Sequence, residues 1–124
     1  MHEWSIADNL VKLIVPAAER EELSSVSRVV IRVGVLQQIV PESLELAFDM
    51  LSRETVISGA ELRIEMIPLR ARCRACGIEF GGTEFAFTCP DCGKIDPEII
   101  SGKELYIDYI EGEKETPNSK TPSL

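Results

Sequence analysis

The chain has 124 residues, of which 44% are hydrophobic and 27% are charged, and this balance is typical of one folded domain or of a domain with a small appendage. Its formal net charge of −8 argues against binding to nucleic acid or to an anionic membrane surface, because both attract basic proteins. The sequence contains no apolar run of about 18 residues and no secretory signal at its start. We therefore expect a cytoplasmic protein without a membrane span.

The first predicted element is an amphipathic helix over residues 5–21. Apolar residues recur there at helical spacing and form one stripe, made of Ile6, Leu10, Leu13, Ile14 and Ala17. Pro16 interrupts this pattern, because it lacks a backbone N–H and crowds the preceding turn. We therefore expect a kink or an early stop at Pro16.

A strand, a second helix and a second strand follow. Residues 26–35 and 60–66 each alternate between apolar and polar side chains, as strands with one buried face do. Between them, Pro41 fits the first position of a helix. The buried face of that helix is expected to hold Leu44, Ala47, Phe48 and Leu51. Residues 104–110 predict a last strand, and the polar segment after it is expected to be disordered.

All four cysteines of the chain lie in two matched pairs, with twelve residues between the pairs. Both pairs have the pattern C-x2-C-G, and they are Cys73 with Cys76 and Cys89 with Cys92. Two thiolates on such a tight turn grip one side of a metal ion, so two turns supply the four ligands of a structural zinc site. A site closed by four thiolates has no position left for water or substrate, which argues against catalytic zinc.

Other interpretations of the cysteines remain open. Two disulfides or free buried thiols are possible, although a reducing compartment disfavours disulfides. Iron is a further alternative, since C-P-x-C-G also occurs in rubredoxin-like sites.

The fold prediction is α+β, with two helices on one face of a small three-stranded sheet and a zinc-ribbon module inserted before the last strand.

The N-terminus carries the only histidine, in the sequence Met1-His2-Glu3-Trp4. A histidine at this place is often a frayed terminus without a role. However, the Met1 amine, nearby amide nitrogens and the His2 imidazole lie within a few bonds of one another. Such a nitrogen-rich, roughly planar donor set suits Ni(II) or Cu(II), and Glu3 or Glu42 would add an oxygen.

The start Met1-His2-Glu3-Trp4-Ser5, the later Val40-Pro41-Glu42-Ser43-Leu44 and the paired cysteines together resemble the HypA/HybF family of nickel-delivery proteins. The resemblance runs from Met1 to about Ile110. It implies that His2 is the principal nickel ligand, that Glu3 belongs to the same motif, and that the four cysteines hold zinc. It also implies a nickel-binding domain over residues 1–69 plus about 100–111, a zinc-ribbon domain over 70–99 and a disordered tail over 112–124.

The resemblance implies a metallochaperone that passes Ni(II) to the large subunit of [NiFe] hydrogenase with help from a HypB-type GTPase. The chain has no phosphate-binding loop, so nucleotide chemistry must come from that partner. We expect a monomer or weak homodimer. We also expect that the protein is not an enzyme, because no nucleophilic triad is recognisable. The alternative is a zinc-ribbon module associated with nucleic acid or transcription. Arg70, Arg72 and Arg74 form the only tight basic cluster, which we interpret as solvated strand ends or a partner contact.

Overall fold

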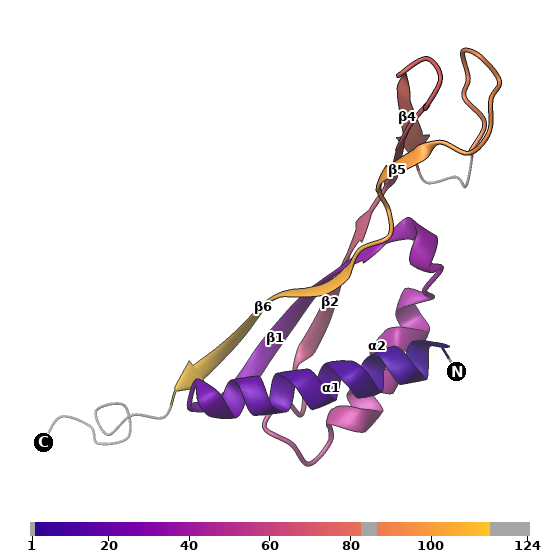
Figure 1. Cartoon of the computed structure of the whole chain (residues 1–124). Helices are drawn as coiled ribbons and strands as arrows, with labels where there is room; N and C mark the ends of the chain where they lie inside the picture. Colours follow the sequence, from indigo (N-terminus) through magenta and orange to yellow (C-terminus); the bar gives the residue numbers. More distant parts are fainter. Residues whose placement is uncertain (1, 83–86, 115–124) are drawn as a thin grey trace, which may run out of the picture. The chain divides into compact units, whose positions relative to one another are not determined.

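The computed structural model describes residues 2–82 and 87–114 and contains two helices and two three-stranded sheets (Figure 1). The helices are α1 (His2–Arg20) and α2 (Pro41–Ser52), and a short 3-10 turn covers Val35–Gln37. The first sheet has the order β2-β1-β6, formed by β2 (Glu61–Ile67), β1 (Leu23–Gly34) and β6 (Leu105–Lys114). The second has the order β4-β3-β5, formed by β4 (Glu79–Gly82), β3 (Leu69–Arg72) and β5 (Glu98–Ser101).

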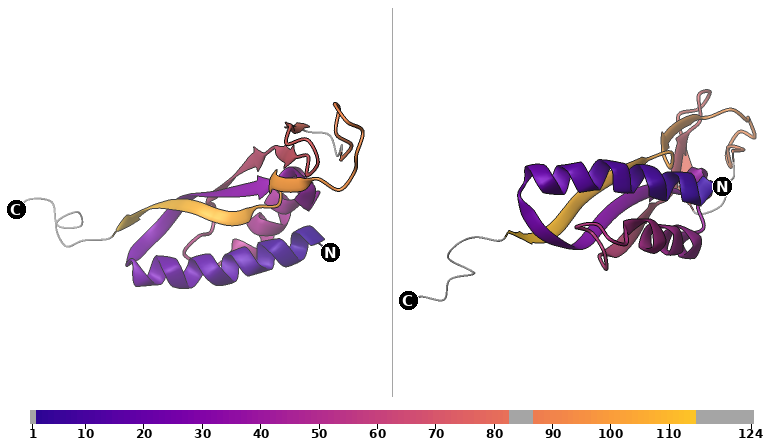
Figure 2. Two further views of the ribbon diagram at one scale, coloured as in Figure 1. Left: turned by 45° about the horizontal axis from the view of Figure 1, so that its top comes forward. Right: turned by 90° about the horizontal axis from the view of Figure 1, so that it is seen from below.

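The chain divides into two compact units. The first takes in the chain up to Ile31, Val40–Arg63 and the chain from Ile107, and the second consists of Arg32–Ile39 and Ile64–Tyr106. In the first unit, α1 and α2 pack side by side and cover one face of the sheet (Figure 2). The second unit contains the β4-β3-β5 sheet and all four cysteines. The α+β prediction, with a cysteine module inserted before the last strand, is confirmed.

Helix α1 begins at His2, earlier than the predicted residue 5, and it continues through Pro16 to Arg20. Of the two expectations for Pro16, a kink or an early stop, the early stop is therefore wrong. Ala18, two residues after the proline, is fully buried, so the packing of this last turn outweighs the one lost hydrogen bond. The predicted stripe also shifts, because Ala7 and Ala18 are buried whereas Leu13 is 61% exposed.

Helix α2 begins at Pro41 as predicted, and its buried face includes Leu44, Ala47 and Phe48. Helix α2 packs against α1, and the central strand β1 also contributes buried apolar residues. The largest fully buried side chains of the chain are those of Phe48, Ile14, Ile31, Leu44, Ile57 and Leu69. In the described residues, no helix is long and apolar enough to cross a membrane.

Ion pairs join the central strand to both of its neighbours. The Arg28 guanidinium on β1 lies 2.9 Å from a carboxylate oxygen of Glu61 on β2 and 2.9 Å from one of Glu111 on β6. Further along β6, the Ser24 hydroxyl donates a hydrogen bond to the Glu113 carbonyl at 3.0 Å. Strand β6 runs to Lys114, so residues 112–114, which were predicted to belong to a disordered tail, form strand. Residues 115–124 of the predicted tail lie outside the described residues.

The three strands of the cysteine module were not predicted. Strand β3 pairs antiparallel with β4, with Arg72 opposite Glu79, and with β5, with Arg72 opposite Glu98. Each strand has only four residues, and Leu69 and Ala71 are the buried positions of β3. Alternation over so few residues gives almost no signal in the sequence.

Candidate metal centres

Each cysteine pair forms the same tight turn at the end of a strand or loop. In the first turn, the Gly77 N–H donates to the Cys73 carbonyl at 2.9 Å, and the Cys73 N–H donates to the Ile78 carbonyl at 2.9 Å. In the second turn, the same two bonds run from Gly93 to Cys89 at 3.0 Å and from Cys89 to Lys94 at 2.9 Å. The two loops therefore have a common backbone pattern, as their shared C-x2-C-G sequence indicates.

The glycine of each turn has a conformation that other residues adopt at a cost. Gly77 has φ of +81° and Gly93 has φ of +75°, which lie in the left-handed region. This bend lets backbone N–H groups point at sulfur. The Cys76 N–H lies 3.5 Å from the Cys73 Sγ, and the Cys92 N–H lies 3.4 Å from the Cys89 Sγ.

The two turns bring all four sulfur atoms together, within 4.8 Å of one another. Across the two turns, the Sγ atoms of Cys73 and Cys92 are 3.4 Å apart, and those of Cys76 and Cys89 are 3.6 Å apart. A tetrahedral zinc ion with Zn–S bonds of about 2.3 Å requires sulfur–sulfur edges of about 3.8 Å. The cluster therefore has the size of a four-thiolate metal site, and its sulfurs are too far apart for a disulfide.

The surroundings of the cluster shift the pKa values of its cysteines in opposite directions. Hydrogen bonds from the Cys76 and Ala75 N–H groups lower the pKa of Cys73 to about 6. The Ile78 N–H acts in the same direction on Cys76, but partial desolvation and the neighbouring cysteines raise the pKa of Cys76 to about 12. The pKa of Cys89 is lowered by N–H groups, the Cys92 N–H first, whereas that of Cys92 is raised. Four thiolates at this spacing need a positive ion at their centre.

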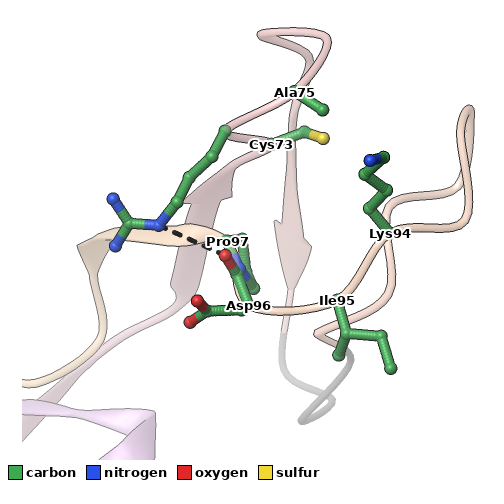
Figure 3. Close-up of a pocket in the computed structure, with 7 residues that line it drawn as sticks. Cys73, Ala75, Lys94, Ile95, Asp96 and Pro97 are labelled. Carbon is green, nitrogen blue, oxygen red and sulfur yellow. Dashed lines mark hydrogen bonds between the residues drawn. The ribbon is translucent and has the colours of Figure 1, made fainter.

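A pocket of about 270 Å³ opens beside Cys73, between the two loops of the module (Figure 3). The Lys94 ammonium group lies on the opposite side of this pocket from the Cys73 sulfur. The Arg74 Nε donates to the Asp96 carbonyl at 3.2 Å and so ties the first loop to the segment after the second.

The other arginines of the basic cluster are engaged by carboxylates. Arg70 and Arg72 lie 3.3 and 3.0 Å from the two oxygens of Glu79, and Arg72 lies 3.5 Å from Glu98. Hydrogen bonds from Arg72 and Arg70 hold the pKa of Glu79 below its usual value. These ion pairs agree with the interpretation of the arginines as strand ends in solvent. Because carboxylates neutralise Arg70 and Arg72, these two residues do not provide the free basic surface that nucleic acid binding requires.

The second candidate site is at the N-terminus, where His2 is the exposed first residue of α1. Glu3 follows it, and its Oε2 accepts a hydrogen bond of 3.0 Å from the Val40 N–H, just before α2. This bond is the main reason why the pKa of Glu3 is lowered, so the carboxylate is ionised near neutral pH. This contact could not be predicted from the sequence, because Val40 contributes only its backbone and lies 37 positions away.

Glu3 thus provides a cap for α2 that α2 itself lacks. Val40 is the N-cap residue, and it has no side chain able to accept from the first turn of the helix. Met1 lies outside the described residues. Among residues 2–82 and 87–114, no third histidine, cysteine, aspartate or glutamate joins His2 and Glu3 in a metal-binding group, so Glu42 is not brought to them.

A small α+β layer with an inserted ribbon that clusters four cysteines defines a class of small metal-binding proteins. Comparison with known proteins narrows this class. The family model described as hydrogenase/urease nickel incorporation, metallochaperone, HypA matches residues 1–112. The chain therefore belongs to the HypA family, which is a family of metallochaperones and not of enzymes.

Curated relatives agree with this assignment, and a solved structure shares the fold. A hydrogenase maturation factor HypA from Dehalococcoides mccartyi is 38% identical over 96% of this chain and 100% of its own. Another from Aquifex aeolicus is 38% identical over 90% of this chain and 96% of its own. The solution structure of the Ni metallochaperone HypA from Helicobacter pylori has a TM-score of 0.66 and 23% identity, and it covers 93% of this chain and 100% of its own.

Proposed function

We propose that this chain binds Ni(II) at its N-terminus and delivers it for insertion into [NiFe] hydrogenase, while the four cysteines hold a structural zinc ion. The main observation in support of the nickel site is the position of His2. Its side chain is exposed at the open end of α1, next to an ionised Glu3 that is fixed by the Val40 N–H. An ion to be handed over must be accessible to a second protein, and this end of the helix is accessible.

In this proposal the Met1 amine and the His2 imidazole supply nitrogen ligands, and Glu3 supplies oxygen. The Oε2 atom of Glu3 is engaged by Val40, so Oε1 is the oxygen that faces the ion. Nitrogen and oxygen donors in a roughly planar set favour Ni(II) over Mg²⁺ or Ca²⁺. Zinc stabilises the ribbon when bound to Cys73, Cys76, Cys89 and Cys92, and it supplies no chemistry to the delivered nickel.

The partners follow from this role. The recipient is the large subunit of [NiFe] hydrogenase, and a HypB-type GTPase supplies the nucleotide-dependent step, both acting with this chain in the cytoplasm. We propose that the chain works as a monomer or a weak homodimer. The delivery site then remains open to a partner in each copy.

Calorimetric titration with Ni(II) tests the terminal site. The native untagged chain is compared with His2→Ala and with a chain extended by a few residues before Met1. We expect both changes to abolish tight binding, because one removes the imidazole and the other converts the terminal amine into an amide. Glu19→Ala, an exposed change at the other end of α1, serves as the control and should bind as the native chain does. Equal binding by all four chains would contradict the proposal.

A further inference from the structure

An apolar groove lies between α1 and α2, at the end of the helices where His2 stands. The groove has a volume of about 270 Å³ and is lined by Glu3, Trp4, Ser43, Leu46, Ala47 and Met50. Three of these side chains are large, apolar and exposed, with Trp4 at 43%, Leu46 at 61% and Met50 at 46%. The space is that of one or two large apolar side chains.

The groove is distinct from the core that the same helices form. Helix α2 buries Leu44 and Phe48 on one side, whereas Leu46 and Met50, four residues apart, project together on another. Scattered exposed apolar residues are normal, and Leu13 on α1 is an example. Three large ones gathered around a hollow are characteristic of a binding surface.

The rim of the groove on α2 is acidic. Glu42 and Asp49 are four residues before and three residues after Leu46, so they border it on the helix surface, and Glu45 is an exposed acidic residue further round the same helix. Asp49 pairs with Arg53 at 3.3 Å. In the part of the chain that the structure describes, neither Glu42 nor Glu45 has an ion-pair partner.

This charge selects the occupant. A second copy of the chain on a two-fold axis would bring the same acidic rim against itself, which is repulsive. The Glu3 carboxylate adds a further negative charge inside the groove. A protein segment that inserts apolar side chains and carries lysine or arginine beside them is complementary to both features.

We propose that this groove is the docking site for the protein that receives the nickel, through a segment with one or two large apolar side chains flanked by lysine or arginine. That the docking protein is the one that receives nickel rests on the proposed function. The link between the two sites is that His2, the proposed nickel ligand, directly precedes the groove residues Glu3 and Trp4 in the sequence. A segment seated in the groove brings the recipient's own metal ligands to His2.

Trp4 makes the test direct, because it is the only tryptophan of the chain. The chain labelled with fluorotryptophan carries a single fluorine signal from inside the groove. The probe is the purified, nickel-free large subunit of the hydrogenase from the same organism. We expect its addition to shift the fluorine signal, and we expect calorimetry to give an affinity that weakens as salt is added.

Leu46→Lys removes an apolar anchor and adds a repelling charge, and it should weaken binding at least about tenfold. Leu13→Lys is the matched control, since Leu13 is equally exposed at 61% on a surface outside the groove, and it should bind as the native chain does. Glu42→Lys with Glu45→Lys should also weaken binding, whereas Glu19→Lys with Glu21→Lys should not. All of these positions are exposed, and circular dichroism checks that each variant is folded.

Several outcomes would overturn the docking site. They are no binding of the large subunit, binding without a change in the fluorine signal, or equal weakening by Leu46→Lys and Leu13→Lys. A fluorine signal that depends on chain concentration before the probe is added would assign the groove to a second copy. If cutting the chain after Lys114 by itself changes the fluorine signal before the probe is added, the groove belongs to its own C-terminal segment.

A Ni(II) titration of the same variants separates this inference from the proposed function. Leu46→Lys should keep native nickel affinity, because it lies outside the ligand set. If the native chain fails to bind nickel but docks through the groove, the proposed function fails and the docking surface stands. If nickel binds at His2 and docking ignores the groove variants, the docking surface fails and the nickel site stands.

Discussion

Glu3 combines two roles that a change of one residue separates. Its Oε2 accepts the Val40 N–H, and its charge faces the proposed nickel ion. Glu3→Gln keeps an oxygen able to accept from Val40 but loses the charge, whereas Glu3→Ala loses both. We expect both variants to bind Ni(II) more weakly and only Glu3→Ala to lower the melting temperature, because an N–H at the start of α2 then loses its acceptor.

Calorimetry and thermal unfolding monitored by circular dichroism check this prediction. Glu45→Ala on α2 is the control, since its side chain is exposed and has no ion-pair partner in the described part of the chain. Native nickel affinity in Glu3→Gln would show that the charge of Glu3 is not needed for the ion. Equal melting of Glu3→Ala and the native chain would show that the Val40 bond contributes little.

At the scale of elements, Gly34 determines how β1 meets the turn that leads into β6. Its backbone has φ of −70°, which any residue adopts, so the reason for glycine is the close approach of Gly102. A Cβ at position 34 would lie 2.0 Å from the Gly102 carbonyl oxygen. The Gly34 N–H also donates to the Glu104 carbonyl at 2.7 Å, which holds the two segments together.

Gly34→Ala should therefore destabilise the fold by about 1–3 kcal/mol, because the backbone of the 102–104 turn must move away from β1. Chemical denaturation measures this loss. Gly59→Ala is a useful comparison, since Gly59 has φ of +79° but open space around its Cβ, so its cost is backbone strain alone. A native free energy of unfolding in Gly34→Ala would mean that the turn yields without cost.

How far the sequence predicts each element depends on how local its signal is. The start of α2 at Pro41 and most of its buried face were predicted, because they rest on neighbouring residues, although Leu51 is only half-buried. The error at Leu13 arises because a stripe of apolar residues on α1 leaves its centre uncertain by one position. The four-residue strands of the ribbon are too short for a periodic pattern.

The same reasoning applies to the sites. The cysteine spacing predicts that four thiolates converge, because each pair is a local turn, and the structure brings them together. By contrast, the bond from Val40 to Glu3 and the groove at Trp4 depend on how α1 packs against α2. Trp4, for example, is 43% exposed and lines this groove, which its place in the sequence does not indicate. Contacts between distant segments leave no trace in spacing.

At the scale of the whole molecule, the two candidate metal centres belong to different units. All four cysteines are in the second unit, whereas His2 and Glu3 are in the first, where Ile14, Leu44 and Phe48 form a buried core. The first unit thus has packing that does not depend on a metal. The ribbon has few buried side chains, and structural zinc contributes about 10–16 kcal/mol in small zinc domains.

Cys73→Ser should therefore lose zinc and the order of the β4-β3-β5 sheet, while α1 and α2 persist and nickel still binds at His2. His2→Ala should lose nickel and keep one zinc per chain. Metal analysis of purified protein, amide NMR spectra and Ni(II) calorimetry measure these effects, and a strong zinc chelator should reproduce the Cys73→Ser spectrum in the native chain. Loss of zinc in His2→Ala, or loss of the helices in Cys73→Ser, would mean that the two centres depend on each other through the strands that both units share.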